Sequence, residues 1–123
     1  MNNELTDQII ISDLRTRCII GVNEDERREK QDVTINLNIE TDIRKAAQTD
    51  CLQDALDYRA LKKEILKVVE NSSYCLLEAL TEAIAARCLE EPKVTRVKVK
   101  VEKTSALRFA RSVGVKITRT RKE

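Results

Sequence analysis

The stretch VTINLNIE, residues 33–40, decides the fold because apolar and polar side chains alternate along it without a break. Successive side chains of a strand point to opposite faces of a sheet, so this pattern predicts a strand with one buried and one polar face. Residues 96–102 and 113–117 alternate in the same way. A two-residue period with one polar face is typical of an antiparallel sheet rather than a parallel one.

The rest of the pattern adds a fourth strand and two helices. Residues 9–20 are expected to form the first strand, although the alternation breaks at Ser12 and Asp13. Between the second and third strands the period becomes helical, and Pro92 closes the second helix. The helical stripes hold Tyr58, Leu61, Ile65, Val68 and Val69, and then Leu77, Leu80, Ile84 and Cys88. The predicted fold class is α+β, in the order β-β-α-α-β-β, with two helices on one sheet face and open sheet edges.

Length and composition predict a single domain over residues 1–123. The chain weighs 14.1 kDa, with 41% hydrophobic and 36% charged residues and a net charge of +2. This balance disfavours a nucleic-acid binder, which would concentrate basic residues on one face. The N-terminus lacks a basic leader and a long apolar run, so we expect no membrane segment and a cytoplasmic protein.

The chain contains no histidine, which narrows the chemistry that it can perform. Ser-His-Asp and Cys-His catalysis and nearly every ordinary zinc or iron site are excluded. Acid–base chemistry would fall to Lys, Tyr, Cys or Glu. The four cysteines contain no CxxC pair, so we expect buried thiols in a reducing compartment and no metal or other cofactor.

Four positions carry candidate chemistry. Lys103 shares the parity of the buried valines of its strand, so it is either a lysine that reaches solvent at the sheet margin or a desolvated base. Glu78, in the first turn of the second helix, either complements the helix dipole or accepts paired N–H groups from an amidine-like heterocycle. Tyr58 starts the first helix, either as a core residue or as a ligand-stacking or acidic group. Glu26 belongs to an acidic loop after Gly21, and such loops are usually only solvated.

Four segments, taken together, identify a resemblance. They are LRTRCIIGVNEDERREKQDVTINLNIE (14–40), DALDYRALKKEI (54–65), SYCLLEALTEAIA (73–85) and VKVEKTSALRFARSVGVKI (99–117). In this order, over nearly the whole chain, they resemble the dihydroneopterin aldolase and epimerase family of T-fold enzymes. The resemblance implies a homo-oligomer, tetramer or octamer, whose edge strands join into a ring-shaped β barrel with helices outside. It also implies active sites at subunit interfaces and a small-molecule pterin substrate.

The resemblance also implies roles for the candidate residues. Glu78, with the backbone at Leu77, would bind the amino-pyrimidinone edge of the pterin. Tyr58 would reach the site across the interface as a proton donor, and Glu26 would lie at the reacting side chain. Lys103 would direct proton transfer through water in a retro-aldol step that needs no metal and no Schiff base. Cleavage gives 6-hydroxymethyl-dihydropterin and glycolaldehyde, and rebonding to the other aldehyde face gives the 2′-epimer, dihydromonapterin.

Two departures from the aldolase pattern favour the dihydroneopterin triphosphate 2′-epimerase branch. Ile20 stands where aldolases usually have histidine, and no proline follows Lys103. Arg108 and Arg111 follow instead, either as surface arginines or as groups that bind substrate phosphates. One alternative is an ordinary folate-pathway aldolase. Another is a non-catalytic α+β RNA-binding module, which the missing GxxG loop and strand aromatics disfavour.

Overall fold

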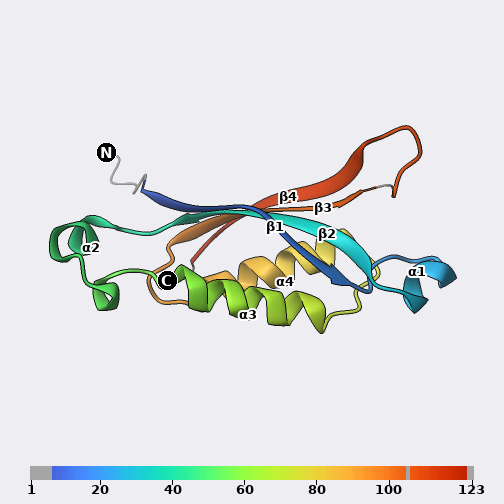
Figure 1. The fold of residues 1–123 in the computed structure, drawn as a ribbon. Coiled ribbons are helices and arrows are strands. Elements are labelled where there is room, and N and C mark those ends of the chain that lie inside the picture. Colours follow the sequence, from blue (N-terminus) through green and yellow to red (C-terminus); the bar gives the residue numbers. More distant parts are fainter. Residues whose placement is uncertain (1–6, 105, 122–123) are drawn as a thin grey trace.

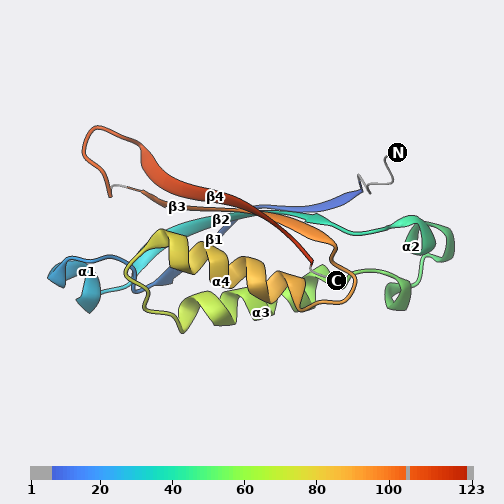
Figure 2. The same cartoon turned by 180° about the vertical axis from the view of Figure 1, so that it is seen from behind.

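The structure is a computed structural model that describes residues 7–104 and 106–121. Its elements are β1 (Gln8–Cys18), α1 (Glu24–Arg28), β2 (Gln31–Glu40), α2 (Arg44–Thr49), the 3-10 turn η1 (Leu52–Asp54), α3 (Tyr58–Glu70), α4 (Leu77–Leu89), β3 (Arg96–Thr104) and β4 (Ser112–Thr120). The four strands form one antiparallel sheet in the order β1-β2-β3-β4. Helices α3 and α4 lie together on one face of it (Figures 1 and 2). The predicted α+β architecture is therefore confirmed.

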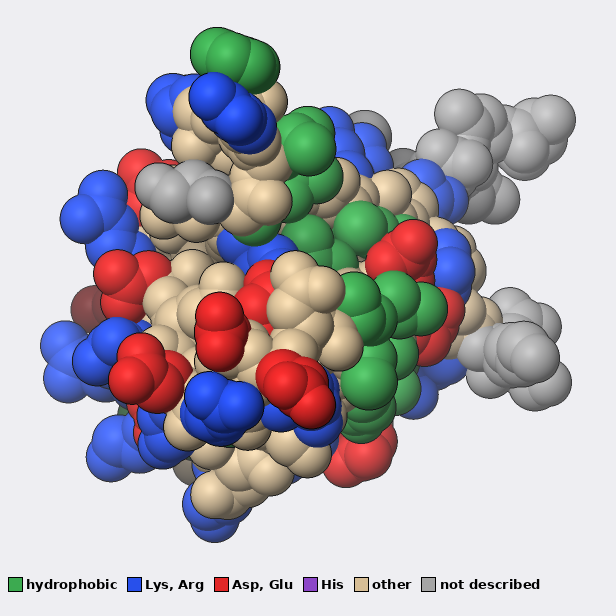
Figure 3. Space-filling view, turned by 90° about the vertical axis from the view of Figure 1, so that its right-hand side faces the viewer, with side chains coloured by type: hydrophobic (Ala, Val, Ile, Leu, Met, Phe, Trp, Pro, Cys, Tyr) green, Lys and Arg blue, Asp and Glu red, His purple; other side chains and the backbone are tan. Residues whose placement is uncertain are grey.

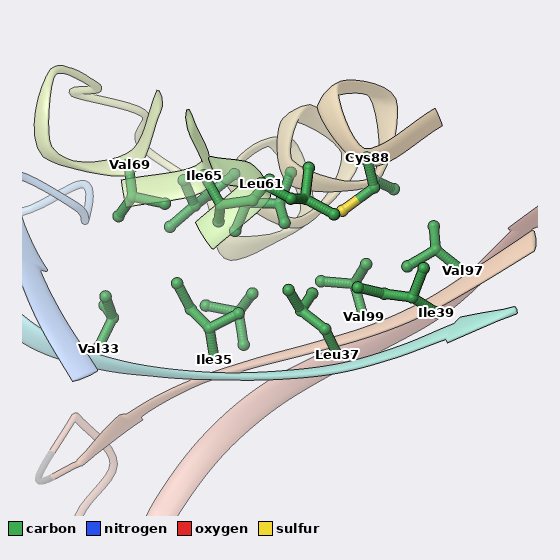
Figure 4. Close-up of a cluster of buried hydrophobic side chains, with 14 of the residues drawn as sticks. Val33, Ile35, Leu37, Ile39, Leu61, Ile65, Val69, Cys88, Val97 and Val99 are labelled. Carbon is green, nitrogen blue, oxygen red and sulfur yellow. The ribbon is translucent and has the colours of Figure 1, made fainter. Parts of the chain in front are cut away.

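The core lies between this face and the two helices. Figure 4 shows the inward side chains of β2 pointing at those of α3. The inward residues of β2 are Val33, Ile35, Leu37 and Ile39, those of β3 are Val97, Val99 and Val101, and α3 contributes Leu61, Ile65 and Val69. Helix α3 packs over β1, and α4 packs over β3 and β4. Burial of apolar area at this interface is the main favourable contribution to folding.

The break in alternation at Ser12 and Asp13 is a bulge in β1. The pairing with β2 shifts between Ile11 and Leu14, and Asp13 has a positive φ of 54°. The side-chain Oδ1 of Asn36 accepts a 2.8 Å hydrogen bond from the Asp13 backbone N–H. The bulge adds a residue without reversing the faces, so Leu14 and Thr16 still point toward the helices.

The structure adds short helices that the sequence pattern did not predict. The acidic run expected to be a loop forms α1, and residues 44–54 form α2 and η1. None of the three elements has a buried residue. Hydrophobic periodicity therefore could not reveal them, because it reports only helices with an apolar face. No helix in the described part of the chain is long and apolar enough to cross a membrane.

The expectation of four buried cysteines is half right. Cys18 and Cys88 are fully buried, and burial raises the pKa of both thiols, that of Cys88 to about 12. Cys51 and Cys75 are exposed, and they lie in the connecting segments before η1 and before α4. All four thiols are free.

The central position of Leu37 gives a stability test. Leu37→Ala should lower the free energy of unfolding by about 2–5 kcal/mol, because it leaves a cavity in a packed core. Leu52→Ala is the matched control, since Leu52 is 68% exposed, and it should change stability little. Urea denaturation of both variants checks this, and similar midpoints for the two would contradict the packing described here.

Candidate active site

Lys103 stands at the end of β3 with its side chain on the inner face of the sheet. It pairs with Val33 of β2, and the residue is only 8% exposed. Its Nζ donates a 3.0 Å hydrogen bond to Oε2 of Glu26. Burying an unpaired ammonium group costs free energy, and the hydrogen bond to Glu26 offsets that cost for Lys103. The predicted inward orientation of Lys103 is thus what the structure has.

Three donors hold the Glu26 carboxylate. Besides Lys103, the Asn23 backbone N–H donates to Oε1 at 3.2 Å, and Nε2 of Gln31 contacts Oε2 at 3.4 Å. The Lys103 hydrogen bond first, and the Asn23 bond second, lower the pKa of Glu26. Gln31 also donates to the Ile20 carbonyl, which fixes its amide beside the carboxylate. Glu26 is therefore an oriented, ionised group at neutral pH.

Gly21 leaves the space that the carboxylate occupies. Its φ of +134° is a conformation that side chains rarely adopt. A Cβ built on Gly21 would overlap the side chain of Glu26. Two features therefore require glycine at this position: the positive φ of its backbone and the close approach of the Glu26 side chain.

Glu78 lies at the same end of the molecule as the Lys103–Glu26 pair. The loop 71–76, which leads into α4, is hydrogen-bonded to the segment before α1 from the Gly21 N–H to the Tyr74 carbonyl at 3.3 Å. Figure 1 shows α1, this loop and the β3–β4 turn at one end, and Figure 3 looks onto that end, where hydrophobic side chains gather on one flank. Glu78 is exposed, and its side chain has no hydrogen bond or ion pair with the described residues.

The start of α4 adds backbone donors next to Glu78. Leu76, which precedes the helix, provides no side-chain cap for it. The first N–H groups of a helix have no partner inside the helix, so those at Leu77 and Glu78 remain available to a ligand. The Leu77 side chain itself is buried in the core. A carboxylate beside free N–H groups can bind a planar heterocycle that has both donors and acceptors.

Tyr58 does not join this group within one chain. Tyr58 is the first residue of the 13-residue helix α3, and loop 71–76 begins after the last residue of this helix. At 1.5 Å per residue, the two ends of α3 lie about 18 Å apart. The Tyr58 residue is 51% exposed beside a cavity of about 630 Å³ between η1 and α3. Neither Glu26 nor Lys103 lines this cavity.

The two candidate arginines lie in and at the end of the β3–β4 turn, of which Ser105 is outside the described residues. The Arg108 guanidinium is 5.1 Å from the centroid of the Phe109 ring. Arg111 is 3.8 Å from Oε2 of Glu102. Phe109 is 96% exposed. Arg108 is thus the arginine that has no carboxylate partner among the described residues.

Sequence reasoning missed the residues that orient Glu26. Asn23 and Glu26 have the spacing of a helix capping box, which is the signal that could have shown α1 and the Glu26 orientation. Gln31, which contacts the carboxylate and is held by the Ile20 carbonyl, had no such signal, because a backbone partner leaves no pattern in the sequence. In the described residues, no three Cys, Asp or Glu side chains are grouped to hold a metal ion.

A four-stranded antiparallel sheet covered by two helices, with a buried lysine–carboxylate pair at its end, defines an enzyme of the T-fold class. The chain belongs to the dihydroneopterin aldolase (FolB) family, whose sequence profile matches residues 9–118. It is therefore a pterin-converting enzyme.

The chain is similar to relatives named as epimerases and to relatives named as aldolases. The dihydroneopterin triphosphate 2′-epimerase of Pseudomonas aeruginosa is 41% identical over 88% of this chain and 88% of its own length. The Escherichia coli K12 epimerase is 38% identical over 89% of this chain and 92% of its own length. The crystal structure of E. coli dihydroneopterin aldolase in complex with neopterin has a TM-score of 0.89 at 30% identity, covering 93% of this chain and 99% of that one.

The lowered pKa of Glu26 predicts a pH-dependent contribution to stability. Because the folded-state pKa lies below the ordinary value of 4.5, the contribution is complete above that value and is lost as the pH falls through the folded pKa. Glu26→Gln should therefore destabilise the protein more at pH 6 than at pH 3, as measured by urea unfolding at both values. An equal effect at the two pH values would contradict an ionised Glu26.

Proposed function

We propose that the protein epimerises dihydroneopterin triphosphate at C2′, by a retro-aldol step followed by re-addition of the aldehyde. The observation that carries the proposal is the buried Lys103–Glu26 pair, which places an amine and an oriented carboxylate together at the end of the sheet. The proposed enzyme acts in the cytoplasm, which the four free thiols support.

The proposed reaction consists of one proton transfer and the cleavage of one carbon–carbon bond. Lys103 first gives its ammonium proton to solvent, and the neutral amine then takes the proton of the 2′-hydroxyl through a bridging water. The C1′–C2′ bond then breaks, its electron pair enters the pterin ring as an enamine, and C2′ becomes an aldehyde carbon. Re-addition of C1′ to the opposite aldehyde face gives the 2′-epimer. Protonation of C1′ instead gives 6-hydroxymethyl-dihydropterin and releases the two-carbon aldehyde. Glu26 stabilises the positive charge on Lys103 whenever the amine holds a proton.

Binding of the pterin ring is proposed for Glu78 and the Leu77 backbone. Glu78 is exposed and has no partner among the described residues, and the first N–H groups of α4 lie beside it. One carboxylate can accept two parallel N–H bonds from the amino-pyrimidinone edge, as it does from a guanidinium group. The neopterin complex of the E. coli aldolase supports a pterin ligand for this fold.

The preference for epimerisation rests on local residues. Named relatives include both activities, so overall identity does not separate them. Ile20 replaces the usual aldolase histidine, and the segment after Lys103 lacks the usual aldolase proline and contains Arg108 and Arg111. Arg108, which has no carboxylate partner in the described turn, is proposed to bind the substrate phosphates.

The position of Tyr58 supports the proposal of an active site shared between subunits. In the family pattern this tyrosine is a proton donor, yet α3 separates it from Lys103 by about the length of the helix. Strands β1 and β4 leave the sheet with two edges that a second copy can pair with. We therefore propose a homo-oligomer, a tetramer or octamer closed into a ring-shaped β barrel, in which Tyr58 reaches the site of a neighbouring subunit.

The direct test is a product analysis of the wild-type enzyme and of Lys103→Ala. The wild type, given dihydroneopterin triphosphate, should form mainly the 2′-epimer, separable by chromatography. Lys103→Ala should lower kcat by about 10²–10⁴-fold, the usual range for a general acid–base group. Lys98→Ala is the control, because Lys98 lies on the polar face of the same strand. Efficient cleavage of unphosphorylated dihydroneopterin, with no preference for the triphosphate, would favour an ordinary aldolase.

Mixing inactive variants tests the shared site. Tyr58→Phe and Lys103→Ala, unfolded and refolded together, should recover activity that neither has alone. In random 1:1 oligomers, about a quarter of the interface sites would combine an intact Tyr58 with an intact Lys103. Recovery to that level, measured by product formation, supports shared sites. A fully active wild-type monomer in sedimentation would overturn them.

The phosphate role of Arg108 predicts a substrate-dependent effect. Arg108→Ala should raise KM for the triphosphate about tenfold, because one charge-assisted hydrogen bond is lost. It should leave KM for unphosphorylated dihydroneopterin nearly unchanged. Arg111→Ala is the matched control, since Arg111 pairs with Glu102. Equal changes in KM for both substrates would argue against phosphate binding.

A further inference from the structure

Arg27 links α1 to the loop that leads into α4. Its Nη1 donates to the Gly21 and Tyr74 carbonyls, both at 3.0 Å, and its Nη2 donates to the Ser73 carbonyl at 2.6 Å. The partners in the loop are 46 and 47 residues away in the sequence. One side chain thus joins two segments that are distant in the chain.

The contact suits arginine in particular. All three partners are backbone carbonyls, and no carboxylate pairs with Arg27 in the described structure. A planar guanidinium has five N–H donors in fixed directions, so it can satisfy several carbonyls at once. A lysine ammonium is a point charge on a flexible stem and cannot hold the same geometry.

The two linked segments carry opposite halves of the proposed site. Arg27 directly follows Glu26 in α1, and the Tyr74 carbonyl lies four residues before Glu78. The Tyr74 carbonyl also accepts from the Gly21 N–H, so the loop is held at both Gly21 and Arg27. The carboxylate at the reacting bond and the carboxylate that binds the ring are therefore connected through one guanidinium group.

We infer that Arg27 is a positioning residue that sets the distance between Glu26 and Glu78, and so aligns the bound pterin with the Lys103–Glu26 pair. The inference rests on the proposed function, because it needs both ends of the substrate to bind this face. Arg27 itself does not touch the reacting atoms. If the ring and the Lys103–Glu26 pair keep one distance, the aldehyde formed at the pair stays opposite C1′, and re-addition is favoured over release.

The experiment compares Arg27→Ala and Arg27→Lys with the control Arg28→Ala. Arg28 is the neighbouring arginine, and its ion pairs in the described part of the chain, with Glu24 and Asp25, are exposed. For each variant the ratio of epimer to cleavage product, kcat and KM are measured on dihydroneopterin triphosphate. Hydrogen exchange of the amides in residues 71–76 is followed in parallel. The product ratio and KM do not depend on the fraction of folded enzyme, so a loss of stability alone does not change them.

Arg27→Ala should shift the product ratio at least threefold toward cleavage and raise KM several-fold, with faster exchange in residues 71–76. Arg27→Lys should lie between it and the wild type, and Arg28→Ala should match the wild type. An Arg27→Ala enzyme with wild-type ratio and KM would overturn the positioning role. A wild-type enzyme that converts no dihydropterin would instead overturn the proposed function, and the positioning role with it.

Discussion

The hydrogen bond between Lys103 and Glu26 is the contact on which the candidate site depends. Burying an ammonium group is costly unless it is paired, and Lys103, with 8% of its residue surface exposed, is paired with the Glu26 carboxylate. That carboxylate must come from outside the sheet, because β2 and β4 offer Val33 and Val113 as the neighbours of Lys103. Helix α1 carries Glu26, and Gly21 leaves space for its side chain. Hydrogen bonds from the Asn23 backbone and from Gln31 hold the carboxylate in this position.

Predictions from the sequence succeeded where the physical cause is local. Alternation along a strand depends on residues two apart, so β2, β3 and β4 and the inward direction of Lys103 could all be read directly. The bulge at Asp13 appeared as a break in the alternation of β1, although the Asn36 side chain that accepts a hydrogen bond from it lies on another strand.

Prediction was weaker where a contact joins distant segments. Glu26 and Lys103 are 77 residues apart, and Glu26 could be identified only by resemblance. The contacts of Arg27 could not be predicted, because every residue has a backbone carbonyl and the sequence does not show which one accepts. Short exposed helices such as α2 were missed for the related reason that they bury nothing. In the proposed oligomer Tyr58 completes the site of a neighbouring subunit, and the periodicity of one chain does not reveal such a contact.

The length of α3 has a consequence for how this protein can vary. In the proposed oligomer, the helix begins at the Tyr58 of one site and ends at the loop that leads to Glu78 of another. One inserted turn would displace these ends relative to each other by about 5.4 Å, more than a proton transfer can tolerate. In such a ring the spacing of the catalytic centres would fix the number of residues in α3, and natural insertions and deletions should accumulate in residues 41–57 instead.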